Sequence, residues 1–231
     1  KWYLRDSNFG PDLPTRARRA EWFLKKSMNQ DVSGTIAVNL ETLKLLLSAI
    51  GPLELPDYDE TINAGNLAER AQYHAEVNFF PGSTAKKEFL SSVADALFEK
   101  IKTADAKSLL SVSAALMSSL ESSDTQVSVT SPNSEKILQT LGWNGGIENK
   151  PCPTSPCYDD YLYSVDSNFG VNKANFYITK DMNLDINVSK DGEPTHTLTT
   201  TWKNAATSNA WPAGSYKNYA RLYLPPSSSL V

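Results

Sequence analysis

The chain has 231 residues, of which 40% are hydrophobic and 21% are charged, proportions that suit a globular protein with a buried core. Its formal net charge of -4 excludes a general nucleic-acid-binding protein, which would carry a basic face. The sequence has no run of about eighteen apolar residues, so we expect none of its segments to span a bilayer.

The first part of the chain alternates helical and strand-like patterns. Apolar residues at helical spacing after Pro14 predict a first helix over 15–28, and Gly51-Pro52 is a stop signal for a Leu-rich second helix over 41–50. Further helices are predicted over 66–77, from Ser83 or Thr84 to 103, from Asp105 to 120, and from 133 to 141. Strands are predicted over 35–40, 53–55 and 125–130. These elements predict an α/β layered domain over residues 1–148.

The composition changes after residue 148. Residues 149–158 are rich in proline and polar side chains and predict a connector. Strand-like stretches then follow at 161–165, 176–179, 182–188, 196–202 and 219–224. The dipeptide Asp191-Gly192 predicts a hairpin turn. We therefore expect an antiparallel β module over 159–231 and an α+β fold class for the whole chain.

Both ends of the sequence are typical of the interior of a longer protein. The segment 1–4 has the pattern of the end of a strand, and the sequence stops just as an apolar pair, Leu230-Val231, begins. We therefore expect the β module to be truncated and a signal or an anchor to lie in other parts of the parent protein.

The two cysteines, Cys152 and Cys157, are separated by four residues that include two prolines. A disulfide closing so short a loop would contribute about 2 kcal/mol and would favour an oxidising compartment. Free thiols are the alternative. A zinc site would need two more soft ligands, and His74 and His196 lie far away in the sequence, so we expect no metal site.

The pentapeptide Asp-Ser-Asn-Phe-Gly occurs twice, at 6–10 and at 166–170, each time after an apolar stretch. The plain interpretation is two strand-to-turn corners, in which Asp and Asn bond their own backbone and Gly adopts a positive φ. The alternative is two loops that share one pocket. From the second copy and its flank we take Asp166, Asn168 and Lys173 as ligand-binding candidates.

A charged cluster surrounds the start of the first predicted helix. Arg16 and Arg19 would lie roughly on one face, where they and the helix N-terminus could receive an anion. Asp6 and Asp12 could hold a magnesium ion that bridges to this anion. Together with Arg5, these residues are the catalytic candidates of a phosphotransferase. The plain alternative is a solvated helix face whose ion pairs contribute about 0–1 kcal/mol each.

Several segments resemble the bacterial domain of unknown function 4012 family, in which "DxNxxPDFPTSA" precedes a helix, "DGVIAVD" forms a strand and "LLxxTGP" ends the next helix. The resembling segments are residues 5–23, 33–39, 47–53, 141–145 and 165–177. Leu13 stands where that family usually has Phe, and Asn39 where it usually has Asp. The resemblance implies an extracytoplasmic bacterial cell-envelope protein, with a membrane-anchored parent and no established activity.

The order of the parts also resembles the LytR-CpsA-Psr family, which transfers glycopolymers from polyprenyl-phosphate carriers to the cell wall. The counterparts here are residues 36–40, 51–53 and 63–73. Those transferases hold the carrier phosphates with arginines, because a guanidinium binds phosphate through two bonds at once. After Tyr73 this chain has no arginine at the matching positions, and Arg70, a further ligand-binding candidate, lies one turn early. The resemblance therefore implies a loss or a change of catalysis.

Three functions remain open. The first is a non-catalytic module that binds a glycopolymer, a lipid-linked precursor or an envelope protein. The second is a divergent LytR-CpsA-Psr-like phosphotransferase that acts on polyprenyl-phosphate-linked glycopolymer with magnesium, and the third is a structural spacer. A deep apolar tunnel at residues 5–19 would favour the transferase, and exposed aromatic residues on the β part would favour binding. The aromatic residues available to stack on sugars are Trp202, Trp211, Tyr216 and Tyr219.

The sequence contains no Gly-x-Ser-x-Gly nucleophile motif and no phosphate-binding loop. This favours a protein that is not an enzyme and that needs no cofactor, without deciding the question.

Overall fold

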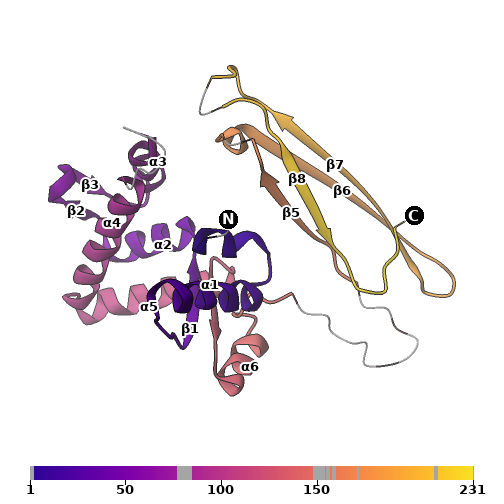
Figure 1. Cartoon of the computed structure of the whole chain (residues 1–231), viewed down its shortest axis with the longest axis horizontal. Coiled ribbons are helices and arrows are strands. Elements are labelled where there is room, and N and C mark those ends of the chain that lie inside the picture. Colours follow the sequence, from indigo (N-terminus) through magenta and orange to yellow (C-terminus); the bar gives the residue numbers. More distant parts are fainter. Residues whose placement is uncertain are drawn as a thin grey trace. The chain divides into compact units, whose positions relative to one another are not determined.

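The computed structural model describes residues 3–76, 85–147, 154, 157, 160–170, 172–210 and 213–230. The chain divides into two compact units, residues 1–147 and 148–231, each of which is described by itself (Figure 1). The fold class is α+β, as the sequence predicts, because helices α1 to α6 are accompanied by antiparallel pairs of strands. In the described part of the chain, no helix combines the length and the apolar character needed to cross a membrane.

The described residues of the first unit form six α-helices and two short antiparallel strand pairs. Its helices are α1 (Leu13–Met28), α2 (Leu40–Ile50), α3 (Leu67–Glu76), α4 (Ala85–Lys102), α5 (Ala106–Glu121) and α6 (Pro132–Thr140). Its strands are β1 (Gly34–Val38), β2 (Leu53–Leu55), β3 (Glu60–Ile62) and β4 (Thr125–Val129), where β1 pairs with β4 and β2 with β3. The predicted helices and strands of this part are confirmed to within a few residues. Strand β3 was not predicted, and the predicted caps Ser83 and Thr84 lie outside the described residues.

Local capping fixes the ends of several helices. The side chains of Asp12, Asn39 and Asp105 cap α1, α2 and α5, each by accepting a hydrogen bond from a backbone N–H three residues later. Helix α2 ends at Gly51, whose φ of +84° is accessible mainly to glycine. These signals involve only near neighbours, which is why the helix ends can be predicted from the sequence.

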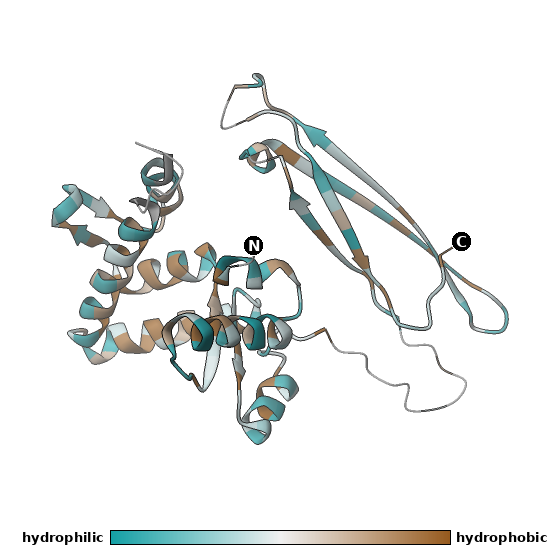
Figure 2. Ribbon diagram, viewed as in Figure 1, coloured by the Kyte–Doolittle hydropathy of each residue, from teal (hydrophilic) through white to brown (hydrophobic). Residues whose placement is uncertain are grey.

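The core of the first unit lies between α2, α3, α4, α5 and the β2–β3 hairpin. Phe89, Val93 and Leu97 of α4 recur at helical spacing and are 0%, 1% and 4% exposed. Apolar residues are concentrated on α2 and α5, which pack against each other (Figure 2). Burial of these side chains supplies the main stabilisation of this unit.

The predicted strand end over residues 1–4 is wrong for Tyr3 and Leu4, and the rest of that prediction lies outside the described residues. Residues Leu4–Phe9 form a 3-10 helix, η1, because the carboxylate of Asp6 accepts a hydrogen bond from the backbone N–H of Tyr3 at 2.8 Å and closes a tight turn. The first Asp-Ser-Asn-Phe-Gly copy therefore lies mainly within a helical turn. Gly10 has a φ of -75°, and Gly170 of the second copy also lacks the predicted positive φ.

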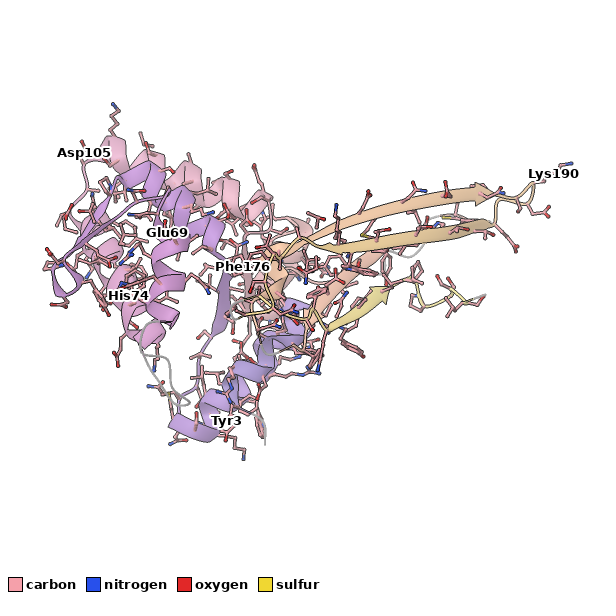
Figure 3. The ribbon with its side chains drawn as sticks, turned by 90° about the horizontal axis from the view of Figure 1, so that it is seen from above. Tyr3, Glu69, His74, Asp105, Phe176 and Lys190 are labelled. Carbon is pink, nitrogen blue, oxygen red and sulfur yellow. The ribbon has the colours of Figure 1, made fainter. Side chains whose placement is uncertain are left out.

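The strands described in the second unit form two antiparallel ribbons. Strand β5 (Tyr163–Asn168) pairs with β8 (Asn218–Tyr223), and β6 (Ile178–Val188) pairs with β7 (Pro194–Asn204). The β6–β7 hairpin with its Asp191-Gly192 turn is confirmed, and Lys190 lies at its tip (Figure 3). The predicted strand at 176–179 is partly wrong, because a 3-10 turn, η3 (Ala174–Tyr177), precedes β6. That turn is favoured by the side chain of Asn172, whose oxygen accepts a hydrogen bond from the backbone N–H of Ala174 at 3.1 Å.

Candidate functional site

The register of the two ribbons brings their facing side chains together. Asp166 of β5 lies opposite Ala220 of β8, and Lys180 of β6 lies opposite Trp202 of β7. Alternate residues of a strand point to opposite faces, so each of these pairs shares a face of its ribbon. The ammonium of Lys180 donates to Asp166 Oδ2 and to Ser164 Oγ, both at 2.6 Å. These bonds show that the two faces meet.

Asp166 is the centre of this contact. Its Oδ2 pairs with Lys180, and its Oδ1 accepts a hydrogen bond from Asn218 Nδ2 at 2.6 Å. Burial by itself would raise the pKa of Asp166, but the hydrogen bonds from Lys180 and Asn218, the positive charge of Lys180 and the Trp202 side chain together lower it. The Asp166 and Lys180 side chains are 20% and 24% exposed, so the pair is largely shielded from water. We therefore expect Asp166 to be ionised and matched by Lys180.

Beside this ion pair lies an open hollow of about 570 Å³. It is lined by residues from β6, β7, β8 and the segment before β8: Ile178, Trp202, Asn204, Ser215, Tyr216, Asn218 and Ala220. It occupies the end of the hairpin near Phe176, remote from the tip at Lys190 (Figure 3). A volume of this size is in the range of small-molecule sites. The combination of aromatic rings and side-chain amides suits a ligand that has both apolar faces and hydroxyl groups.

Two aromatic residues of the hollow are influenced by the Asp166–Lys180 pair. Trp202 is 37% exposed, and its ring centroid lies 5.8 Å from the ammonium of Lys180, within range of a cation–π contact. Burial and the negative charge of Asp166 raise the pKa of Tyr216, which keeps its hydroxyl protonated. The ion pair under the hollow thus influences both aromatic side chains.

The second Asp-Ser-Asn-Phe-Gly copy positions the segment that carries Tyr216. Asn168 donates to Asn172 Oδ1 at 2.9 Å, and Asn172 in turn donates to the carbonyl of Ser215 at 2.9 Å. A Cβ atom added to Gly170 would lie 2.7 Å from the same Ser215 oxygen, so only glycine allows this close approach. Asn168 therefore acts on the hollow indirectly, by holding one of its walls.

The other candidates from the second unit lie elsewhere. Lys173 precedes η3 and is not one of the described residues that line the hollow. Tyr219 is 51% exposed and lies on the opposite face of its ribbon from Asn218 and Ala220. Trp211 lies outside the described residues. Cys157 is disulfide-bonded, whereas Cys152 lies outside the described residues.

The charged cluster around the start of α1 is used for internal contacts. Asp12 caps α1 through Thr15 N at 2.9 Å and also accepts from the backbone N–H of Ile147 at 3.1 Å. Arg16 donates to the side chains of Asn8 and Gln126 and so joins η1 to β4. These bonds direct the carboxylate and the guanidinium to different neighbours, which gives little support to a shared anion site.

Two of the remaining members of that cluster, Arg5 and Arg19, are exposed, and Asp6 is partly exposed. The Arg5 side chain is 80% exposed and pairs with Asp6 only at 3.9 Å, while Arg19 is exposed on the surface of α1. Within the ranges that the structure describes, no group of three or more His, Cys, Asp or Glu residues is placed to hold a metal ion. The magnesium site of the phosphotransferase hypothesis thus has no ready set of ligands among the described residues.

Arg70 is engaged by a carboxylate that the sequence reasoning missed. Its Nε donates to Glu60 Oε2 at 2.8 Å, and its Nη2 donates to Glu60 Oε1. His74 Nε2 lies 2.9 Å from Glu60 Oε1, and the His74 ring stacks on the buried ring of Phe89 at 4.3 Å. The hydrogen bond from Arg70 outweighs burial and lowers the pKa of Glu60 to about 2. Glu60 thus accepts the two guanidinium hydrogen bonds of Arg70 that a phosphate would need.

The partners of both histidines come from elements that are distant in sequence. Glu60, the partner of His74, lies on β3, a strand of three residues that is too short to be predicted from the sequence. His196 Nε2 lies 3.0 Å from Asp160 Oδ2. An aspartate or glutamate at such a separation has no periodic or motif signal. Only the fold identifies these pairs.

Comparison with known families concerns the first part of the chain. No curated protein matches the chain. Residues 1–75 of the 231 match the model of the family described as "Protein of unknown function (DUF4012)". The match thus supports a relationship of the N-terminal segment to the DUF4012 family, and it does not extend to the ribbons that form the hollow.

Proposed function

We propose that the second unit is a non-catalytic glycan-binding module, and that the chain is part of an extracytoplasmic protein of a bacterial cell envelope. The proposal is supported above all by the hollow, in which Trp202 and Tyr216 lie near the amides of Asn204 and Asn218. The disulfide bond of Cys157 agrees with an oxidising compartment. The match of residues 1–75 to a family of unknown function assigns no activity.

The chemistry of the hollow fits a sugar. The apolar face of a pyranose ring can pack against an indole or phenol ring, while its hydroxyl groups exchange hydrogen bonds with amides, which both donate and accept. The amide of Asn204 is already oriented, because its nitrogen donates to the carbonyl of Gly214 at 3.1 Å. A preformed wall lowers the entropy cost of ligand binding. The hollow is therefore suited to recognition.

The charge distribution favours binding over hydrolysis. Glycoside hydrolysis requires two carboxyl groups on either side of the scissile bond. The described residues that line the hollow include no carboxylate, and the adjacent Asp166 is committed to Lys180 and Asn218. This arrangement lacks the second acid or base, which is why the proposed module is non-catalytic.

The test is a calorimetric titration of this chain with soluble cell-wall oligosaccharides, with Trp202→Ala beside Trp22→Ala. Trp22 is a suitable control because it is 56% exposed and lies on α1 of the first unit. We expect Trp202→Ala to weaken binding about tenfold or more, which corresponds to about 1.4 kcal/mol, and Trp22→Ala to leave it unchanged. Equal affinities for the two variants, or no glycan binding by the parent chain, would contradict the proposal.

A further inference from the structure

The residues around the hollow carry balanced charges. The seven described residues that line it have no formal charge, and Asp166 and Lys180, the ion pair beside it, neutralise each other at 2.6 Å. From this balance we infer that the hollow selects uncharged sugar segments and discriminates against glycans that carry phosphate or carboxylate groups. The inference deepens the proposed glycan-binding function and rests on it.

The charge of Lys180 is already balanced before an anion arrives. Its ammonium already donates to Asp166 and to Ser164, and it lies over the ring of Trp202 at 5.8 Å. An anionic ligand would have to compete for the charge of Lys180 with Asp166, whose carboxylate lies 2.6 Å from the ammonium. Removing one partner of such a pair is strongly unfavourable.

Asp166 also repels a second negative charge. The influence of its charge reaches Tyr216, whose pKa it raises together with burial. A phosphate or a uronate near the Tyr216 hydroxyl would meet the same repulsion and would lose part of its hydration. A hydroxyl or acetamido group would not meet this repulsion, because it is uncharged, and it can exchange a hydrogen bond with the exposed Ser215.

The neighbouring cations do not reverse this balance. Lys203 and Arg221 alternate with the lining residues along β7 and β8, so they lie on the opposite faces of their ribbons. Arg221 donates to Ser167 Oγ on that opposite face at 3.0 Å. Lys217 is exposed and is not one of the described lining residues. These three residues therefore supply no anion-binding group to the hollow.

The experiment compares two tetrasaccharides that differ in charge, an uncharged N-acetylglucosamine tetramer and a tetragalacturonate, by calorimetry with the parent chain. We expect the uncharged tetramer to bind at least about tenfold more tightly. Its affinity should change little between about 20 mM and about 500 mM salt, because no ion pair forms on binding. Equal or tighter binding of the tetragalacturonate would overturn the inference and leave the glycan-binding proposal intact. Binding of neither tetramer would count against the proposed function itself.

Two variants then test the cause of the selectivity. Asp166→Asn keeps an oxygen acceptor but leaves Lys180 without its counter-charge, and Ala220→Lys adds a second cation to the lining of the hollow, at the position that faces Asp166 across the β5–β8 pair. Both should raise the ratio of tetragalacturonate to N-acetylglucosamine affinity about tenfold at low salt. Asp181→Asn is the matched control, since it makes the same charge change on the opposite face of β6. An unchanged ratio in folded Ala220→Lys, or the same rise in Asp181→Asn, would contradict the electrostatic cause, even if Asp166→Asn fails to fold.

Discussion

The two units each contain a partly buried carboxylate that is bound by a cation, yet the two arrangements differ in their surroundings. Glu60 is held by Arg70 and His74, and His74 stacks on the core residue Phe89. Asp166 is held by Lys180 next to an open hollow. The comparison teaches that an ion pair and a lowered pKa do not by themselves identify a site. What distinguishes the Asp166 pair is the hollow with its aromatic and amide lining.

The largest expected effect is the loss of stability on replacing Glu60. Glu60→Gln would leave Arg70, whose side chain is only 26% exposed, without its counter-charge, and should lower the free energy of unfolding by about 3 kcal/mol. Urea unfolding measures this value. Glu41→Gln is the control, because the Glu41–Lys44 pair is more exposed and should contribute about 0–1 kcal/mol. Similar losses of unfolding free energy for the two variants would contradict the claim that the Glu60–Arg70 pair stabilises the fold more than an exposed ion pair does.

The same comparison predicts how stability depends on pH. Because folding lowers the pKa of Glu60 from 4.5 to about 2, its contribution is fully present above pH 4.5 and is lost as the pH falls toward 2. The pKa of Asp166 is also lowered, so its contribution has the same sign. Urea unfolding at pH 7, 5 and 3 should show a loss below pH 4.5 that is smaller in Glu60→Gln. A parallel loss in parent and variant would contradict the role given to Glu60.

A smaller effect is expected from the repeated pentapeptide, whose two glycines differ in their surroundings. Gly170→Ala would push the new Cβ against the Ser215 carbonyl, which is 2.7 Å away, whereas Gly10→Ala would meet only Arg16 Cγ at 4.0 Å. We expect a destabilisation of about 1–3 kcal/mol and weaker glycan binding for the first variant, and little change for the second. Thermal unfolding and calorimetry measure the two effects. Unchanged stability and affinity in Gly170→Ala would show that the backbone at Ser215 can move to accommodate the added methyl group.

The smallest effect is expected for Tyr216→Phe. Removal of one hydroxyl from the lining of the hollow should weaken glycan binding by about twofold to tenfold, the range of a single hydrogen bond, while the fold is kept. Tyr58→Phe is the control, since Tyr58 packs against Phe89 in the first unit. Equal effects of the two substitutions on glycan affinity would show that the Tyr216 hydroxyl takes no part in binding.

Helices could be predicted from the sequence because their signals are local. Asp105, for example, caps α5 by accepting from the backbone N–H of Ser108 only three residues later. The repeated pentapeptide shows where local reasoning fails. Asp6 bonds the nearby Tyr3 N and closes a helical turn, whereas Asp166 bonds Lys180 and Asn218 across two ribbons. Identical residues thus adopt different structures because their partners differ.

The candidate site was only partly accessible to sequence reasoning. Trp202 and Tyr216 could be named as sugar-stacking candidates because aromatic residues stand out in a β module. Asn204 and Asn218 could not, since their place beside those rings depends on the pairing of β6 with β7 and of β5 with β8. The roles of Arg16 and Arg70 were hidden for the same reason, because Gln126 and Glu60 reach them only in the fold.

The most direct test of the central claim is an NMR titration of the isotopically labelled chain with the uncharged N-acetylglucosamine tetramer. The account predicts shifts of the Trp202 indole N–H and of the side-chain amides of Asn204 and Asn218, while the Trp22 indole stays unchanged. Shifts centred on Arg16 or Arg70 of the first unit, or no shifts at all, would contradict the assignment of glycan binding to the hollow.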